Sequence, residues 1–168
     1  VGEYALMSLK SPEHFTGASS ELLVASYLAG SGNEVYFPIV TQSRADLIYL
    51  DPTGRPVKVQ VKTGTRSRTG VYLYEQCRLA NRSGRTSYDD AEIDEIYVVG
   101  THLWCFPIDI IRGNTSLCLC SNNPNPRNWD NRRYLPDEHI VMRGSWDSPI
   151  RGVFGGAQRR KTEDATNQ

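Results

Sequence analysis

Residues 57–63 read Val57-Lys58-Val59-Gln60-Val61-Lys62-Thr63, so three valines alternate with three polar residues. A period of two is that of a β-strand, because successive side chains point to opposite faces of the sheet. The stretch predicts a strand with its valines in the core and Lys58, Gln60 and Lys62 together on the other face. A solvent-exposed strand can carry such a polar row without any function. The neighbouring segments therefore have to show whether this row is an ordinary exposed face or part of a functional site.

A second strand is predicted directly upstream, at residues 46–50. The sequence between them, Asp51-Pro52-Thr53-Gly54-Arg55-Pro56, is rich in turn-forming residues and predicts an antiparallel hairpin. If the turn is centred near Gly54, Asp46 falls opposite Lys62 and Ile48 opposite Gln60, with facing Cβ atoms about 5 Å apart. The hairpin then gathers Asp46, Gln60 and Lys62, whereas a slip of one residue would move Asp46 to the opposite face.

Residues 17–30 have the pattern of a helix. Ser19 or Ser20 can cap its start, and the glycines at 30 and 32 can end it. Glu21 lies at the edge of the apolar stripe or within it. The helix dipole favours an acid in the first turn, which explains its presence there but not an inward orientation. A glutamate, an aspartate, an amide and a lysine that can converge indicate a metal-dependent site for cutting nucleic acid.

The remaining pattern predicts one α+β (α/β) domain. Further strands are expected at 34–40, 70–76, 93–100, 102–107 and 115–120, with one helical turn at 107–112 and loops at 79–88 and 121–131. The length of 168 residues suits a single domain over 1–154, and the polar residues 155–168 predict a disordered tail.

The composition is that of a soluble globular protein, with 39% hydrophobic and 10% aromatic residues. The apolar runs are too short for a membrane span, so no membrane association is expected. The start of the sequence does not resemble a signal peptide. The four cysteines lack zinc-site spacing and are expected to be reduced, so we predict a cytoplasmic protein.

Charge is unevenly distributed although the net charge is zero. Between Thr63 and Tyr88 there are five arginines and one acid, Glu75, and five acids then occur within residues 89–95. A basic block beside the candidate strand favours binding of a polyanion, and the alternative is a pair of solvated loops of opposite sign. The acidic run is a competing metal site or a solvated loop. The predicted DNA-binding residues are Arg44, Arg66, Arg68, Arg78, Arg82 and Arg85.

At Glu21, Ser43-Arg44-x-Asp46 and Val59-Gln60-Val61-Lys62-Thr63 the sequence resembles the PD-(D/E)XK nuclease superfamily. More narrowly, it is similar to the branch that contains group I intron homing endonucleases, which has Gln where most of the superfamily has Asp or Glu before x-Lys. The resemblance extends over roughly residues 17–134. Its flanks are Gly17-x-x-x-Glu21, Gly30-x-Gly32-x-x-Val35-x-x-Pro38, the Arg-rich loop ending in Tyr88, Ile93-Asp94 and Phe106-Pro107-Ile108. Ala45 stands where the superfamily usually has proline.

The resemblance implies a restriction-endonuclease-like core over about 17–136, with a mixed β-sheet flanked by helices. It implies that Glu21 and Asp46 bind a divalent metal, Mg²⁺ or Mn²⁺, and that Gln60 and Lys62 complete the catalytic set. The backbone carbonyl of Val61 is a candidate third ligand, because Mg²⁺ prefers hard oxygen atoms. Cutting both strands of double-stranded DNA needs two active sites, so a homo-oligomer, dimer or tetramer, is expected.

Three functions follow as hypotheses. The first is a Mg²⁺-dependent, site-specific double-stranded DNA endonuclease of the homing or mobile-element type. The same fold also serves Holliday-junction resolvases and restriction enzymes. The second is a DNA-binding module that cuts weakly or not at all, because Gln60 brings less negative charge to the metal than Glu would. The third is a structural subunit that only uses the fold.

Overall fold

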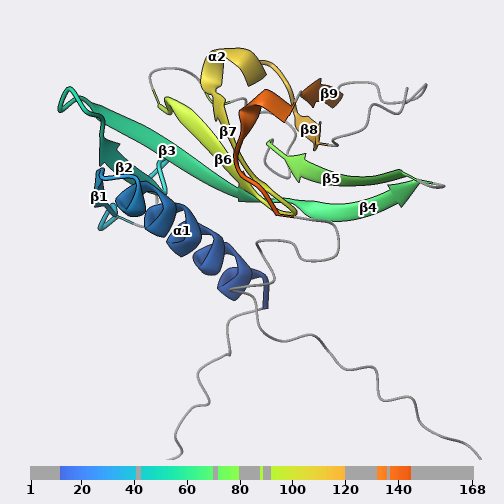
Figure 1. Cartoon of the computed structure of the whole chain (residues 1–168), viewed down its shortest axis with the longest axis horizontal. Helices are drawn as coiled ribbons and strands as arrows, with labels where there is room; N and C mark the ends of the chain where they lie inside the picture. Colours follow the sequence, from blue (N-terminus) through green and yellow to red (C-terminus); the bar gives the residue numbers. More distant parts are fainter. Residues whose placement is uncertain are drawn as a thin grey trace, which may run out of the picture.

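The computed structural model describes residues 12–40, 43–69, 72–79, 88, 92–119, 132–135 and 137–144. These residues form two β-sheets, a long helix and a short one (Figure 1). The expected α+β arrangement with a mixed sheet and helices is therefore confirmed. The predicted tail at 155–168 and the loop at 121–131 lie outside the described residues.

The larger sheet holds the candidate strand in its interior. Its strand order is β1-β2-β3-β6-β7-β10, and only the β3–β6 pair is parallel, which makes the sheet mixed. The strands are β1 Glu34–Tyr36, β2 Leu47–Leu50, β3 Pro56–Thr63, β6 Glu95–Val99, β7 Leu103–Pro107 and β10 Ile140–Met142.

The second sheet begins where β3 ends. After Gly64 the chain continues as β4, and the strand order is β4-β5-β8-β9 (Figure 1). The sequence pattern missed β4, β9 and β10. The remaining elements are β4 Thr65–Thr69, β5 Tyr72–Arg78, α2 Ile108–Ile111, β8 Ser116–Leu119, β9 Arg132–Leu135 and a 3₁₀ turn, Asp137–His139.

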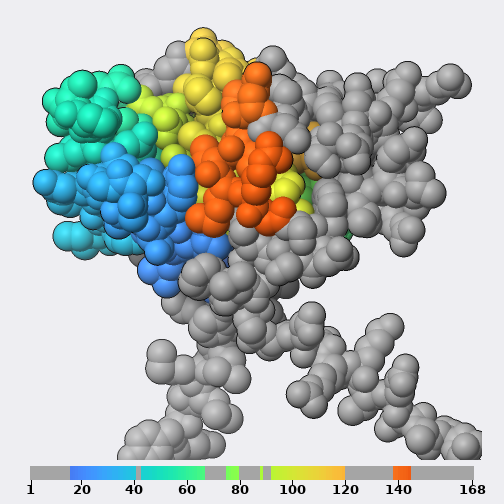
Figure 2. Space-filling view, in the orientation of Figure 1, coloured from blue at the N-terminus to red at the C-terminus, as the bar shows by residue number. Residues whose placement is uncertain are grey.

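Helix α1, Pro12–Gly30, covers one face of the larger sheet. Its Leu23, Val24 and Leu28 share a core cluster with the valines of β3 at 57, 59 and 61, as the alternation predicts. Met142 of β10 packs against the same cluster, and Figure 2 shows α1 and the 138–144 segment on the face in view.

The helix starts at Pro12 rather than at Gly17. Proline suits the first helical turn, because its ring fixes a helical φ and its missing N–H would have had no partner there. Ser19 and Ser20 therefore lie inside the helix, and the prediction that one of them caps it is wrong.

A second core cluster fills the opposite face of the larger sheet and joins the two sheets. It contains Ile96, Val98 and Phe106 of the larger sheet together with Cys77 and Leu117 of the smaller one. On the face of β3 opposite its valines, Gln60 is buried and Lys58 and Lys62 are half-buried, so the polar row is not fully exposed to solvent. Within the described ranges, no helix has both the length and the apolar character to cross a membrane.

The β2–β3 hairpin forms, but its register differs from the prediction by two residues. Leu47 pairs with Val59 and Ile48 with Lys58, whereas the prediction placed Ile48 opposite Gln60. Asp46 itself lies just before β2, and its side chain contacts Gln60. The turn is tighter than expected, because the Asp51 carboxylate accepts hydrogen bonds from the backbone N–H groups of Thr53 and Arg55. A shift of two residues keeps every side chain on its predicted face, so Asp46 still lies on the same side as Gln60 and Lys62.

Candidate active site

Asp46 is fixed against β3 by its backbone and its side chain. Its N–H donates to the Val59 carbonyl at 2.8 Å, just before β2 begins. Its Oδ2 accepts the Val61 N–H at 2.7 Å and the side-chain amide of Gln60. Oδ2 accepts both hydrogen bonds from β3, so neither bond occupies Oδ1, and Oδ1 could bind a cation.

Gln60 contacts two of the predicted metal ligands, Asp46 and the Val61 carbonyl. It is only 8% exposed, and its Nε2 donates to Asp46 and lies 3.5 Å from the carbonyl oxygen of Val61. Rotating the amide by half a turn would place Oε1 where Nε2 now lies. The Asp46 carboxylate, the Gln60 amide and the Val61 carbonyl therefore lie together in the structure.

Glu21 is half-buried on α1, and its pKa is raised. The largest cause is burial, the next is the negative charge of Asp46, and the positive charge of Lys62 opposes both. Burial also raises the pKa of Asp46, against the Val61 hydrogen bond, Lys62 and Gln60. The charges of Glu21, Asp46 and Lys62 thus influence one another. A bound cation would stabilise the ionised form of both partly buried carboxylates.

Ser20 ties the helix to the end of the candidate strand. It is buried, and its Oγ lies 2.8 Å from Oγ1 of Thr63 and donates to the Thr16 carbonyl at 3.0 Å. The neighbours of these two residues are Glu21 and Lys62, so the bond links the parts of the chain that carry them. The sequence analysis considered Ser20 only as a cap and missed this contact.

The predicted DNA-binding arginines have different surroundings. Arg44 is exposed and forms an ion pair with Glu92 at 3.5 Å, and Arg78 is exposed on β5. Arg66 is half-buried, with Nη2 3.5 Å from Oγ1 of Thr101. Arg68 lies on β4, and Arg82 and Arg85 lie outside the described residues.

Glu75, the single acid in the Arg-rich stretch, is buried with 1% exposure. It lies opposite Arg66 in the β4–β5 pair, and its Oε1 accepts the N–H and the hydroxyl of Thr101 at 3.0 and 2.7 Å. Its Oε2 has no hydrogen-bond partner among the described residues. The carboxylate lies against Gly64 and Gly100, where a Cβ would come within 2.6 and 2.7 Å of it. The only sequence signal was its isolation among arginines.

The last part of the acidic run has a structural role. Asp94 accepts the Lys58 N–H at 2.8 Å, and Glu95 accepts the Tyr49 hydroxyl at 3.2 Å. These two residues are therefore not part of a solvated loop. Across the described ranges, no three His, Cys, Asp or Glu side chains are grouped to hold a metal, so any ion at Asp46 has to use amide, carbonyl or water oxygens as well.

Replacing Asp46 with asparagine is expected to stabilise the metal-free protein. The pKa of Asp46 is raised above its ordinary value of 3.8, so the ionised wild-type carboxylate lowers the stability of the folded protein at neutral pH. This destabilisation decreases as the pH falls through the raised pKa towards 3.8, because the carboxyl group becomes protonated in the folded state. A neutral amide avoids this cost and can still accept the Val61 N–H. Solvent screens part of this cost at a half-buried group, so the Tm should rise by at most roughly 2–4 °C at pH 7, the shift that about 1 kcal/mol produces in a domain of this size.

Thermal unfolding of both proteins between pH 4 and pH 8 provides the measurement. The difference in Tm should shrink towards pH 4 and should also shrink at pH 7 when Mg²⁺ is added, because the ion would stabilise only the wild type. A difference that does not vary with pH would contradict the burial of a charged Asp46.

Three comparisons with known proteins agree with this architecture. A model of the PD-(D/E)XK endonuclease family matches residues 12–130. Protein 5.3 of Escherichia phage T7 is 40% identical over 111 residues, which cover 66% of this chain and 92% of the phage protein. The structure of a bacterial homing endonuclease, I-Ssp6803I, has the same fold, with a TM-score of 0.54 at 20% identity over 70% of this chain and 84% of the other. The match over most of the chain confirms the superfamily indicated by the sequence: the chain belongs to the PD-(D/E)XK endonuclease family.

Proposed function

We propose that this chain is a Mg²⁺-dependent, site-specific endonuclease of double-stranded DNA, of the homing or mobile-element type. Membership of an endonuclease family supports nuclease activity. The observation that carries the proposal is the convergence of the Asp46 carboxylate, the Gln60 amide and the Val61 carbonyl, with Lys62 next along the same face of β3.

The residues fit a hard divalent cation. Glu21 and Asp46 offer carboxylate oxygens, and the Val61 carbonyl offers a neutral one. Burial raises the pKa of both carboxylates, and the negative charge of Asp46 raises that of Glu21 further. Mg²⁺ is the proposed ion and Mn²⁺ the substitute. The chemistry that such an ion supplies when bound is charge neutralisation at the phosphate and a more acidic water.

Lys62 is proposed to orient the attacking water and to stabilise negative charge as it develops on the phosphate. Its positive charge already acts on both carboxylates. A fixed cation in a partly buried site stabilises a transition state more strongly than one in bulk water. Gln60 is proposed to add a neutral oxygen after its amide rotates, which predicts weak metal affinity until a substrate phosphate joins the ligands.

DNA is proposed to contact the basic residues Arg44, Arg66, Arg68, Arg78, Arg82 and Arg85. Of these, Arg44 and Arg78 have exposed side chains. The second sheet continues directly from the candidate strand, so it can carry DNA contacts at a fixed position relative to Lys62. We propose a homo-oligomer, dimer or tetramer, because both strands of a duplex have to be cut.

The test is cleavage of duplex plasmid DNA by the purified wild-type chain. We expect cutting at a limited number of positions with Mg²⁺ or Mn²⁺ and none with EDTA. Cutting in EDTA would refute the metal dependence, and degradation without discrete products would refute site specificity.

A DNA-binding module that does not cut is the second candidate. It is favoured by the Gln60 amide, which donates to Asp46 and so presents its nitrogen, not its oxygen, at the ligand position. Retarded migration of DNA with no cleavage under any divalent ion would support this candidate and reject the first.

A further inference from the structure

Tyr88 lies against the proposed catalytic lysine. The Nζ of Lys62 is 5.3 Å from the centroid of the Tyr88 ring, which is within the range of a cation–π interaction. The contact joins β3 to a residue 26 positions further along the chain. Tyr88 was not included in the proposed catalytic set.

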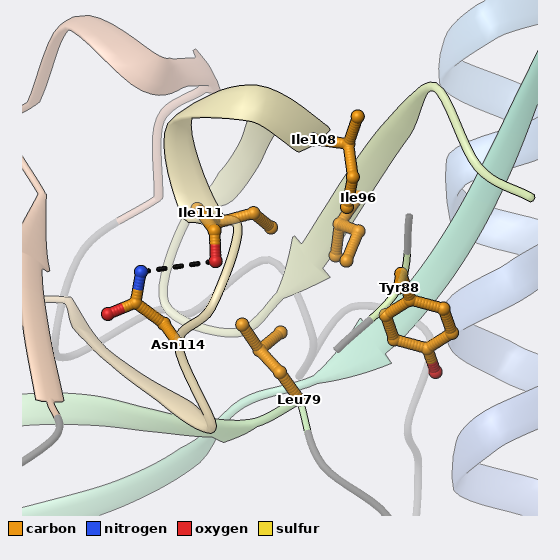
Figure 3. Close-up of a pocket in the computed structure, with 6 residues that line it drawn as sticks. All are labelled: Leu79, Tyr88, Ile96, Ile108, Ile111 and Asn114. Carbon is orange, nitrogen blue, oxygen red and sulfur yellow. Dashed lines mark hydrogen bonds between the residues drawn. The ribbon is translucent and has the colours of Figure 1, made fainter. Parts of the chain in front are cut away.

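The core fixes the Tyr88 ring. The side chain packs against the cluster that joins the two sheets, and it lines a small hollow with Leu79, Ile96, Ile108, Ile111 and Asn114. Figure 3 shows the hydroxyl of Tyr88 pointing away from the isoleucines. Asn114 closes the far side of the hollow by donating to the Ile111 carbonyl at 3.1 Å (Figure 3). The ring is thus supported by apolar contacts that do not require its hydroxyl.

Lysine needs such support more than the other members of the site. Its ammonium is a point charge on a flexible four-carbon stem, whereas Asp46 and Gln60 are already fixed by hydrogen bonds to each other and to β3. An aromatic face carries negative electrostatic potential and attracts the ammonium without removing its charge.

We propose that Tyr88 is a positioning residue, whose ring holds the Lys62 ammonium beside Asp46 and Glu21 in readiness for DNA cleavage. The proposal rests on the nuclease function proposed above. The positive charge of Lys62 influences both carboxylates while its Nζ lies over the ring, so the ring holds the ammonium at a position from which it interacts electrostatically with Asp46 and Glu21.

The activity test compares Tyr88→Phe with Tyr88→Leu under single-turnover conditions at saturating DNA. Phenylalanine keeps the aromatic face, so its rate should stay within about twofold of wild type. Leucine keeps apolar packing but loses the face, so the rate should fall by roughly 2- to 30-fold with unchanged DNA affinity. Tyr27→Leu is the matched control, because Tyr27 packs on Tyr97 in the other core cluster, and its rate should be retained. Equal rates for Tyr88→Phe and Tyr88→Leu would overturn the proposal.

A spectroscopic test does not depend on activity. Ring currents should shift the Lys62 Hε resonances upfield in the wild type and in Tyr88→Phe, and this shift should disappear in Tyr88→Leu but not in Tyr27→Leu. Lys62 resonances at ordinary positions in the wild type would overturn the proposal. Shifted resonances in a protein that cuts no DNA would support the position of Lys62 and reject the nuclease function, so the two failures are distinguishable.

Discussion

Replacing Lys62 with alanine is expected to reduce DNA cleavage by roughly 10²- to 10⁴-fold, the range found for catalytic proton-transfer groups and preorganised charges. Lys62 is the residue whose charge acts on both Glu21 and Asp46, and it follows the converging ligands on the same face of β3. Its loss would leave two partly buried carboxylates near the phosphate without a fixed counter-charge. The measurement is the single-turnover rate at saturating duplex DNA with Mg²⁺.

Lys58→Ala is the matched control for this change. Lys58 lies on the same strand and on the same face as Lys62, is also half-buried, and pairs with Ile48 on the far side of Gln60. Its loss removes the same charge from the same strand, so overall attraction to DNA should fall equally in both variants. A near-wild-type rate for Lys58→Ala beside an inactive Lys62→Ala would place the effect at the active site. Equal losses in the two variants would instead show that the effect is not specific to the position of Lys62, because saturating DNA removes the contribution of general attraction to the polyanion.

The hairpin that carries the site was predictable because its information is local. Alternating valines specify which face of β3 enters the core, and the six turn residues specify that β2 returns antiparallel to it. The predicted register differs from the observed one by two residues. The Asp51 carboxylate closes the turn by accepting the N–H groups of Thr53 and Arg55, and the composition of the turn alone does not reveal these bonds. The error did not change the site, since a shift of two residues preserves the face of Asp46.

The second sheet was less predictable. Strand β4 reads Thr-Arg-Ser-Arg-Thr, which has no apolar alternation, and it forms because it pairs with β5. The contacts of Ser20 with Thr63 and of Tyr88 with Lys62 join residues far apart in the chain. Such contacts leave no periodic signal in a single sequence, so the residues around the proposed site could be found only in the structure.

Gly64→Ala is expected to destabilise the fold by about 1–3 kcal/mol, the usual cost of forcing an extra carbon into a packed interior. The new Cβ would lie 2.6 Å from Oε2 of Glu75. The Glu75 side chain is buried and its Oε1 is hydrogen-bonded to Thr101, so the carboxylate cannot easily move away. Gly17→Ala provides the control, because the site is inside α1 and, among the described residues, nothing beyond the adjoining helix backbone lies within 4 Å of the added Cβ. That change should stabilise the protein by roughly 0.5–1 kcal/mol, since alanine favours a helix over glycine. The measurement is the free energy of unfolding in urea.

A double-mutant cycle with Glu75→Ala tests whether this close approach is the cause. Glu75→Ala alone should destabilise the fold, because it leaves the buried N–H of Thr101 without its acceptor. Adding Gly64→Ala to that variant should cost little, because the carboxylate that blocked the new methyl group is gone. The coupling free energy should then be about 1–3 kcal/mol in favour of the double variant. Additive costs would mean that the chain at Gly64 needs glycine for another reason. A strong coupling would instead identify the buried carboxylate as the contact that requires glycine at position 64, two residues after Lys62.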